Sequence, residues 1–271
     1  MAIYYINGEY HEFKIPPTDI NKVKIAIASN SESKALLSLL CDDDVIGTVG
    51  LPLGNPNIDK EDIERIYKKF KNQGTSTFMA LLNIANNPNT PDDILKDIFN
   101  SFKKGDSSIQ VLMALATNPS TPPEVLEKIF DFEIEHENKH YILGKAIIEH
   151  HRAFYISLYD KLLDKALVDA NLAVALINNE YCIINSVEAL YTHKNANVRY
   201  AVAKSRYCNR NILLTLAEDS SIKVKRAVAA NPSSCALVLD KLVDNNDDYE
   251  ILLNVLMNPN CVEPIYNKII K

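Results

Sequence analysis

The chain has 271 residues, of which 47% are apolar, and its formal net charge is -6. A chain of this length can bury a large core, and its acidic balance argues against wholesale electrostatic binding to nucleic acid or to an anionic membrane. Only 7 Gly and no Trp are present, a composition that suits helices better than turn-rich β structure.

Nothing in the sequence directs the chain to a membrane or to secretion. No apolar run approaches the ~18 residues that span a bilayer, and the segment after Met1 lacks a basic region followed by an apolar one. Five Cys, an odd number without paired spacing, are typical of free thiols in a reducing compartment. We therefore expect a cytoplasmic protein with no membrane partner.

The first residues differ from the rest of the chain. Two β-prone runs, 3–6 and 9–15, flank Asn7-Gly8, which favours a hairpin with a two-residue turn. An isolated hairpin is marginal in water. We therefore expect residues 1–17 to form a β-hairpin cap on the first helices, and residues 18–271 to form the helical part.

A four-residue corner recurs along the helical part: Asn, Pro, any residue, then Ser, Thr or Cys. Asn tolerates the left-handed conformation that closes a helix, and Pro cannot continue that helix. The best copy begins at Asn118-Pro119. There Thr121 is the expected N-cap of the next helix, Pro122 its first residue, and Glu124 the partner in a capping box.

The corner recurs with spacings of 25 to 32 residues, a period that indicates stacked repeats. The nine corner residues are Asn30, Asn55, Asn87, Asn118, His150, Asn179, Ser205, Asn231 and Asn258. Six units carry Ala four residues before the corner, where a small side chain would let neighbouring helices approach. Because one helix pair cannot bury its apolar face alone, the pattern predicts an all-α solenoid of about nine two-helix repeats.

The segments 198–203 and 224–232 read Val-Arg-Tyr-Ala-Val-Ala and Val-Lys-Arg-Ala-Val-Ala-Ala-Asn-Pro. With Thr121-Pro122, they resemble the leucine-rich repeat variant, a bacterial repeat closely allied to HEAT-like repeats. The resemblance covers about residues 20–271 and implies a right-handed superhelix that serves as a binding scaffold. The units are longer than the short family repeat, which leaves room for a full second helix. The N-terminal Cys cluster of some members is missing, since the first Cys is Cys41, so we expect no cofactor.

The segment His136-Glu137-Asn138-Lys139-His140 matches H-E-x-x-H, in which two imidazoles on one helix face bind zinc and Glu is the general base. A third ligand at the usual spacing is missing, because Glu149, His150 and His151 follow too closely. The segment also falls between two repeats. A zinc hydrolase is therefore the weakest hypothesis, and we expect a solvated acidic loop without a metal.

Cys182, Cys208 and Cys261 share one position, three residues after the corner. Equivalent positions in successive units are separated by on the order of 10 Å, whereas zinc needs its sulfur ligands at about 2.3 Å. We therefore expect these Cys to replace Ser or Thr at the corner, without holding a metal or a disulfide.

Positive charge is concentrated between residues 191 and 230. Eight Lys and Arg oppose two acidic residues there, a net +6 that leaves -12 for the rest of the chain. Arg199 and Lys225 occupy the same position in adjacent units, as Lys24 does near the start, which predicts a stacked row. The candidate binding residues are Arg199, Lys204, Arg206, Arg210, Lys225 and Arg226. With Tyr200 and Tyr207 nearby, they could grip phosphates or an acidic protein segment, although charges on solvated helix faces are ordinary.

The repeats account for nearly every patterned residue and leave none for a catalytic set. The leading hypothesis is a non-enzymatic scaffold that binds another macromolecule along its curved surface, and a protein is the expected partner. The alternative is a nucleic acid or another polyanion bound by the basic row at residues 194–226. HEAT-like DNA glycosylases offer an analogy, but they use aromatic residues, notably Trp, around a catalytic Asp, and this acidic chain has no Trp.

Overall fold

The computed structural model describes residues 2–6, 9–13, 20–42, 52–73, 78–101, 108–136, 141–149, 156–179, 184–244 and 247–270. The chain divides into two compact units, unit 1 (Met1–Glu137) and unit 2 (Asn138–Lys271). The described ranges contain 17 α-helices, one 3₁₀ helix and one pair of short strands. The architecture is that of an α-helical repeat protein.

The two strands come first in the chain. β1 (Ala2–Ile6) pairs antiparallel with β2 (Glu9–Phe13), so that Ala2 lies opposite Phe13 and Ile6 opposite Glu9. The predicted turn, residues 7 and 8, lies outside the described residues. A role of this pair as an end cap stays a prediction.

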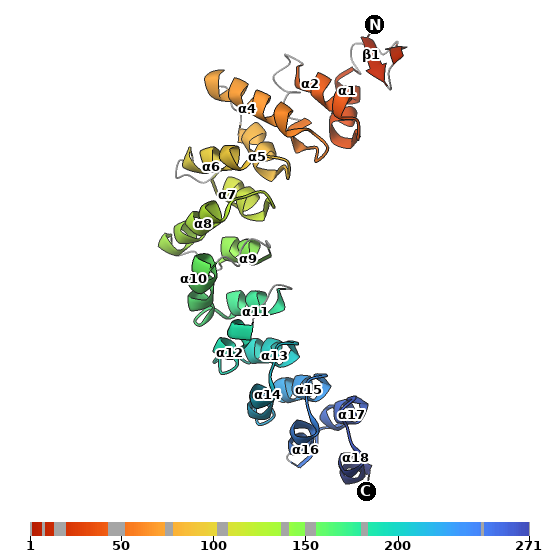
Figure 1. Ribbon diagram of the computed structural model, residues 1–271, viewed down its shortest axis with the longest axis vertical. Helices are drawn as coiled ribbons and strands as arrows, with labels where there is room; N and C mark the ends of the chain where they lie inside the picture. Colours follow the sequence, from red (N-terminus) through yellow and green to blue (C-terminus); the bar gives the residue numbers. More distant parts are fainter. Residues whose placement is uncertain are drawn as a thin grey trace. The chain divides into compact units, whose positions relative to one another are not determined.

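The helices of unit 1 alternate between two layers (Figure 1). The first-helix layer, whose elements end at a corner, consists of α1 (Ile20–Asn30), the 3₁₀ helix η1 (Pro52–Gly54), α5 (Phe78–Asn86) and α7 (Ser108–Thr117). The second-helix layer consists of α2 (Lys34–Cys41), α4 (Lys60–Gln73), α6 (Asp92–Asn100) and α8 (Pro123–Glu135). Within a layer, α5 contacts η1 and α7, and α6 contacts α8.

Unit 2, taken by itself, shows the same alternation of two layers (Figure 1). Its first-helix layer consists of α9 (Ile142–Glu149), α11 (Ala170–Asn178), α13 (Ala196–Lys204), α15 (Ile222–Ala230) and α17 (Tyr249–Met257). Its second-helix layer consists of α10 (Ile156–Ala166), α12 (Ile184–Leu190), α14 (Arg210–Leu216), α16 (Ala236–Asp244) and α18 (Glu263–Ile270). Each first helix from α9 to α17 contacts the next one. The second helices are α-helical, so the longer repeat does hold a full second helix.

The core of unit 2 lies between its layers. Val198 and Val202 on α13 are fully buried, as are Val224 and Val228 on α15. Each pair is spaced by four residues, which puts both side chains on one side of the helix. Leu213 on α14 is also fully buried and belongs to the opposite layer. The apolar periodicity of the sequence therefore gives one continuous core, as expected for stacked repeats.

The corners do not use the left-handed conformation that the sequence analysis expects of their Asn. Asn179, Asn231 and Asn258 have φ of -66°, -70° and -72° with ψ of 138°, 123° and 133°. This is the extended conformation that a following Pro imposes on the residue before it, and Pro follows Asn231 and Asn258. Among the described residues other than Gly, Tyr141 alone has a positive φ, of 43°.

The side chain of the corner Asn instead joins a repeat to the one before it at six of the corners. In Asn118, Nδ2 donates to the carbonyl oxygens of Ala85 at 2.7 Å and Asn87 at 2.8 Å, while Oδ1 accepts from the backbone N–H of Ser120 at 2.8 Å. The same pattern occurs at Asn55, Asn87, Asn231 and Asn258, with Nδ2 to oxygen distances between 2.6 and 3.2 Å. Asn179 donates to the carbonyl of Ile148. We call these six residues the asparagine ladder.

The hydroxyl three residues after the corner Asn closes the preceding helix, and the expected N-cap role of Thr121 is wrong. Thr121 is fully buried and its Oγ1 donates to the carbonyl of Leu115 at 2.6 Å. The N-cap of α8 is Pro122, which offers no side-chain cap, and the helix begins at Pro123. The carboxylate of Glu124 pairs with Lys96 at 2.6 Å.

Thr90 and Ser234 repeat this bond to the carbonyls of Ile84 and Val228, at 2.5 and 2.6 Å. Cys208 takes the same position after Ser205 and is buried, and this burial raises the pKa of its thiol to about 12. Cys41, Cys235 and Cys261 are, like Cys208, free thiols. Cys182 lies outside the described residues.

Candidate functional site

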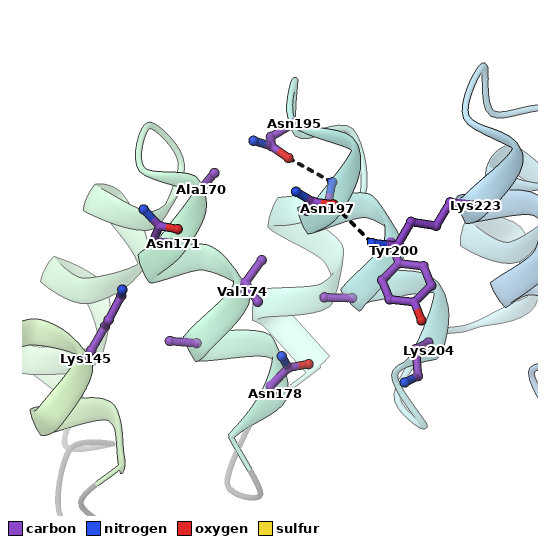
Figure 2. A pocket seen from close by; sticks show the side chains of 12 residues that line it. Lys145, Ala170, Asn171, Val174, Asn178, Asn195, Asn197, Tyr200, Lys204 and Lys223 are labelled. Carbon is purple, nitrogen blue, oxygen red and sulfur yellow. Dashed lines mark hydrogen bonds between the residues drawn. The ribbon is translucent and has the colours of Figure 1, made fainter. Parts of the chain in front are cut away.

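The first-helix layer of unit 2 carries a hollow of about 590 Å³ that crosses α9, α11, α13 and α15. In Figure 2, Lys145 lies at one end on α9 and Lys223 at the other end on α15, with the side chains of α11 and α13 between them. Ala175 and Ala201, at the small-residue position four before the corner, are also part of its lining. We call this hollow the lysine groove.

Three lysines supply the charge of the groove: Lys145, Lys204 and Lys223. Lys223 Nζ lies 4.2 Å from the centre of the Tyr200 ring, and Lys204 Nζ lies 5.5 Å from it. Lys223 also donates to Asn197 Oδ1 at 3.2 Å (Figure 2). Within the described ranges none of the three lysines forms an ion pair, so their charge is available to a ligand.

Four asparagines line the groove as well: Asn171, Asn178, Asn195 and Asn197. Asn195 caps α13, because its Oδ1 accepts from the backbone N–H of Asn197 at 2.8 Å. The amides of Asn171 and Asn178 on α11 are exposed and form no hydrogen bond with any described residue. They therefore differ from the ladder asparagines, whose donors and acceptors are used inside the fold.

Acidic residues are scarce on the helices that form the groove: α9 ends in Glu149, which is not part of the described lining. α11, α13 and α15 contain no Asp or Glu, whereas the second-helix layer carries Asp160 and Asp164 on α10, Glu188 on α12, and Asp240 and Asp244 on α16. Lys268 neutralises the last two, at 2.6 and 3.0 Å. The local charge of the first-helix layer is therefore positive, although the chain as a whole is acidic.

A second hollow, of about 280 Å³, adjoins the lysine groove and shares Asn178, Ala201 and Lys204 with it. It adds the side chains of Arg206 and Tyr207. Arg206 donates to the hydroxyl of Tyr207 at 2.8 Å, and its guanidinium lies 4.8 Å from the centre of that ring. The positive surface thus extends from α9 to the corner that follows α13.

The six residues predicted from the sequence separate into different environments. Lys204 and Arg206 line the two hollows. Arg210 is exposed at the start of α14, in the other layer, and Lys225 is half-buried on α15. Neither of these two lines the groove.

The guanidinium of Arg199 is occupied by contacts within the fold. Its Nε and Nη2 donate to the carboxylate of Asp219 at 2.6 and 2.9 Å, and its Nη1 donates to the carbonyl of His193 at 2.8 Å. The side chain of Asp219 is only 5% exposed. Burial by itself would raise the pKa of Asp219, but the hydrogen bonds from Arg199 and Ser221 N–H lower it. This pair joins α13 to the turn before α15.

Arg226 makes the equivalent connection one unit later. It donates to the carboxylate of Asp248 through Nε at 3.0 Å and Nη2 at 2.8 Å, and its Nη1 lies 2.6 Å from Glu250. Asp248 is the N-cap of α17. Two of the six predicted binding residues are therefore paired with carboxylates of the next repeat.

Comparisons with known proteins support neither a family nor a function for this chain. No family model matches the chain, and no curated protein matches it. Among solved structures, the chain is similar to an engineered protein at 17% identity and a TM-score of 0.28, over 92% of this chain and 76% of that one. A likeness at that score carries no argument.

The H-E-x-x-H segment falls mostly outside the described residues, which end at His136 in this region. His136 follows α8; its ring stacks on Phe132 with centroids 4.0 Å apart, and its Nδ1 lies 2.8 Å from the carbonyl of Phe132. Over the ranges that the structure describes, no group of three His, Cys, Asp or Glu could hold a metal ion. No described helix is both long and apolar enough to cross a membrane.

Unit 1 has a smaller hollow between α4 and α6, of about 270 Å³. Its charges largely satisfy one another: Asp97 accepts from the hydroxyl of Tyr67 at 2.8 Å and pairs with Lys71. The hydrogen bond from Lys71 outweighs burial and lowers the pKa of Asp97. This hollow therefore lacks the unpaired charge of one sign that distinguishes the lysine groove.

Sequence reasoning missed Lys145, Lys223 as a groove residue, and the groove asparagines. Lys145 lies outside the basic stretch, and Asn carries no charge to attract notice. Position relative to the corner was the available signal. Tyr200 and Lys145 lie five residues before their corners, Asn178 and Lys204 one before, and Asn171, Asn197 and Lys223 eight before. These positions share one side of a helix.

Proposed function

We propose that the chain is a non-enzymatic repeat scaffold that binds another protein through the first-helix layer of unit 2. The observation that carries the proposal is the lysine groove, in which three lysines that form no ion pair with a described residue converge with the exposed amides of Asn171 and Asn178. In full, the proposal is a right-handed, HEAT-like solenoid resembling the leucine-rich repeat variant, with the β1–β2 pair as its cap.

The composition of the groove suits a protein ligand. Asn178 and Asn171 offer hydrogen bonds, Val174 and Tyr200 offer apolar contact, and the lysines offer charge (Figure 2). Protein interfaces combine these elements, with aromatic residues near the centre and polar groups around them. Because α9, α11, α13 and α15 pack side by side, a partner bound there would contact several repeats at once.

The rival proposal is nucleic acid, or another polyanion, bound by the basic row at residues 194–226. The lack of Asp and Glu on α11, α13 and α15 favours it. Against it, the guanidinium groups of Arg199 and Arg226, which are suited to bidentate phosphate contacts, are occupied by Asp219 and Asp248. Binding to nucleic acid would weaken steeply with salt.

Site-directed photocrosslinking tests the proposal. A photoreactive residue is placed at Val174, in the groove, or at Glu188, an exposed control position on α12 of the second layer. The tagged full chain is irradiated in native lysate with and without nuclease, and adducts are identified by mass spectrometry. We expect a nuclease-resistant protein adduct from position 174 and none from position 188. Adducts of equal yield at both positions, or a nuclease-sensitive adduct, would contradict the proposal.

A further inference from the structure

We infer that the partner segment held in the lysine groove is an extended, acidic stretch of polypeptide; this inference rests on the proposed protein-binding function. It is carried by three features of the groove: the sign of its charge, the chemistry of its amides, and the state of its aromatic rings.

Charge selects an acidic ligand. Lys145, Lys204 and Lys223 stand on three different helices, and among the described residues no Asp or Glu lines the hollow. The adjoining hollow adds Arg206, and its described lining again contains no carboxylate. Carboxylate side chains of a partner would meet three lysines that form no ion pair within the described part of the fold. A basic or neutral segment would leave them uncompensated.

The amides match an extended backbone. A side-chain amide has both donors and an acceptor, as a peptide group does, and Asn171 and Asn178 lie seven residues apart on α11. At 1.5 Å per residue they are separated by about 10 Å along the helix. The amides of Asn171 and Asn178 form no hydrogen bond with described residues. Both can therefore pair with peptide groups of a bound extended segment, which has no neighbouring strand to satisfy its N–H and C=O groups.

The span of the groove sets the length of the segment. From Lys145 on α9 to Lys223 on α15, it crosses three helix spacings (Figure 2). At about 8–10 Å per spacing the distance is roughly 27 Å, which an extended chain covers with about eight residues. A folded helix of eight residues would reach less than half as far. The groove therefore accommodates an extended segment of about eight residues, whereas a helix would need about 18 residues to span the same distance.

The aromatic rings argue against single-stranded nucleic acid as the occupant. Bases bind such grooves by stacking on exposed aromatic faces. The Tyr200 ring instead has Lys223 at 4.2 Å and Lys204 at 5.5 Å from its centre, and the Tyr207 ring has Arg206 at 4.8 Å. A base would have to displace these cations before it could stack.

The test is fluorescence anisotropy of the full-length protein with a labelled ten-residue peptide of alternating Glu and Ser. Controls are the same peptide with Gln in place of Glu and a ten-nucleotide oligothymidylate. The triple variant Lys145→Gln, Lys204→Gln, Lys223→Gln removes the charge of the groove. The matched control is Lys34→Gln, Lys60→Gln, Lys68→Gln, which removes three exposed lysines of unit 1.

We expect the Glu peptide to bind, the groove triple variant to weaken binding by about tenfold, and the unit 1 variant to leave it unchanged. The double variant Asn171→Ala, Asn178→Ala should weaken binding about threefold without altering its salt dependence, because amides carry no charge. The exposed Asn211 on α14 provides its control as Asn211→Ala.

Equal binding by wild type and the groove triple variant, no binding of the Glu peptide, or tighter binding of oligothymidylate would each overturn the inference. The crosslinking result separates this failure from failure of the proposed function. A protein adduct at position 174 without affinity for the Glu peptide would leave the scaffold in place and remove its preference for acidic segments. Loss of both results would remove the protein-binding function itself.

Discussion

The asparagine ladder makes a quantitative prediction about stability, tested most directly at Asn231. Its side chain is 3% exposed and forms three hydrogen bonds. Nδ2 donates to the carbonyls of Ala203 at 2.6 Å and Ser205 at 3.2 Å, and Oδ1 accepts from Ser233 N–H at 2.8 Å. At about 1 kcal/mol for each buried hydrogen bond, Asn231→Ala should lower the free energy of unfolding by about 3 kcal/mol.

Asn231→Asp sharpens the test, because it keeps the acceptor and the size of the side chain but removes the donors. A carboxylate would face two carbonyl oxygens, and the loss should exceed that of Asn231→Ala at pH 7. Burial and these acceptors would raise the pKa of the new carboxyl in the folded state. The protonated acid recovers one donor, so the deficit of Asn231→Asp relative to wild type should shrink as pH falls from 7 to 4.

The measurement is urea unfolding followed by circular dichroism at 222 nm, with Asn211→Ala on the exposed side of α14 as the matched control. The control should change the free energy of unfolding by about 0.5 kcal/mol or less, since it removes only an exposed side chain. If Asn231→Ala behaves like Asn211→Ala, the ladder does not stabilise the stack, and the recurrence of Asn at the corners needs another cause.

Two further predictions concern the arginines that connect successive first helices and the buried His193. Arg199→Met should lower the free energy of unfolding by about 3 kcal/mol, because it leaves the buried carboxylate of Asp219 without its partner. Arg226→Met should lower it by less, because the carboxylate partners of Arg226 are more exposed. Equal shifts of the melting temperature in the two variants would contradict this. Burial, together with the nearby charges of Lys194 and Arg199, lowers the pKa of His193 in the folded state. The stability that neutral His193 contributes is therefore complete above about pH 6.5 and declines as the pH falls below that value. His193→Asn should remove that part of the decline, and identical pH profiles of unfolding for variant and wild type would refute it.

The repeat and its corners could be predicted from the sequence because both arise from local pattern. Apolar periodicity and Pro mark the helices and their ends, and the corners at Asn87, Asn118 and Asn231 follow helices at the expected positions. The role of the Asn could not be obtained the same way. A single corner shows only a backbone conformation, whereas the partners of its Nδ2 belong to the preceding repeat, 24 to 34 residues earlier.

The candidate site was harder to predict, because a count of charge treats every cation alike. Arg199 is one of the eight cations of residues 191–230, yet it is paired with Asp219, one of the two acidic residues of the same stretch, in the turn before α15. Lys145 lies outside that stretch and still reaches the groove, because α9 contacts α11. Which cations form ion pairs, and which side chains reach the groove, depends on which helices are neighbours in the fold. The amino-acid composition does not contain that information.

The position of a residue relative to its corner predicts whether its side chain faces outward, which composition cannot do. The same positions show where the groove ends. The positions one, five and nine before the corner face outward on the first helices: on α17 they hold Met257, Leu253 and Tyr249, which are 78%, 42% and 75% exposed. The position eight before this corner holds Glu250, which pairs with Arg226. The positions that carry Lys, Tyr and Asn on α11 and α13 thus carry apolar side chains and one carboxylate on α17. The positive surface therefore ends at α15, and a partner that continues onto α17 must offer apolar side chains there.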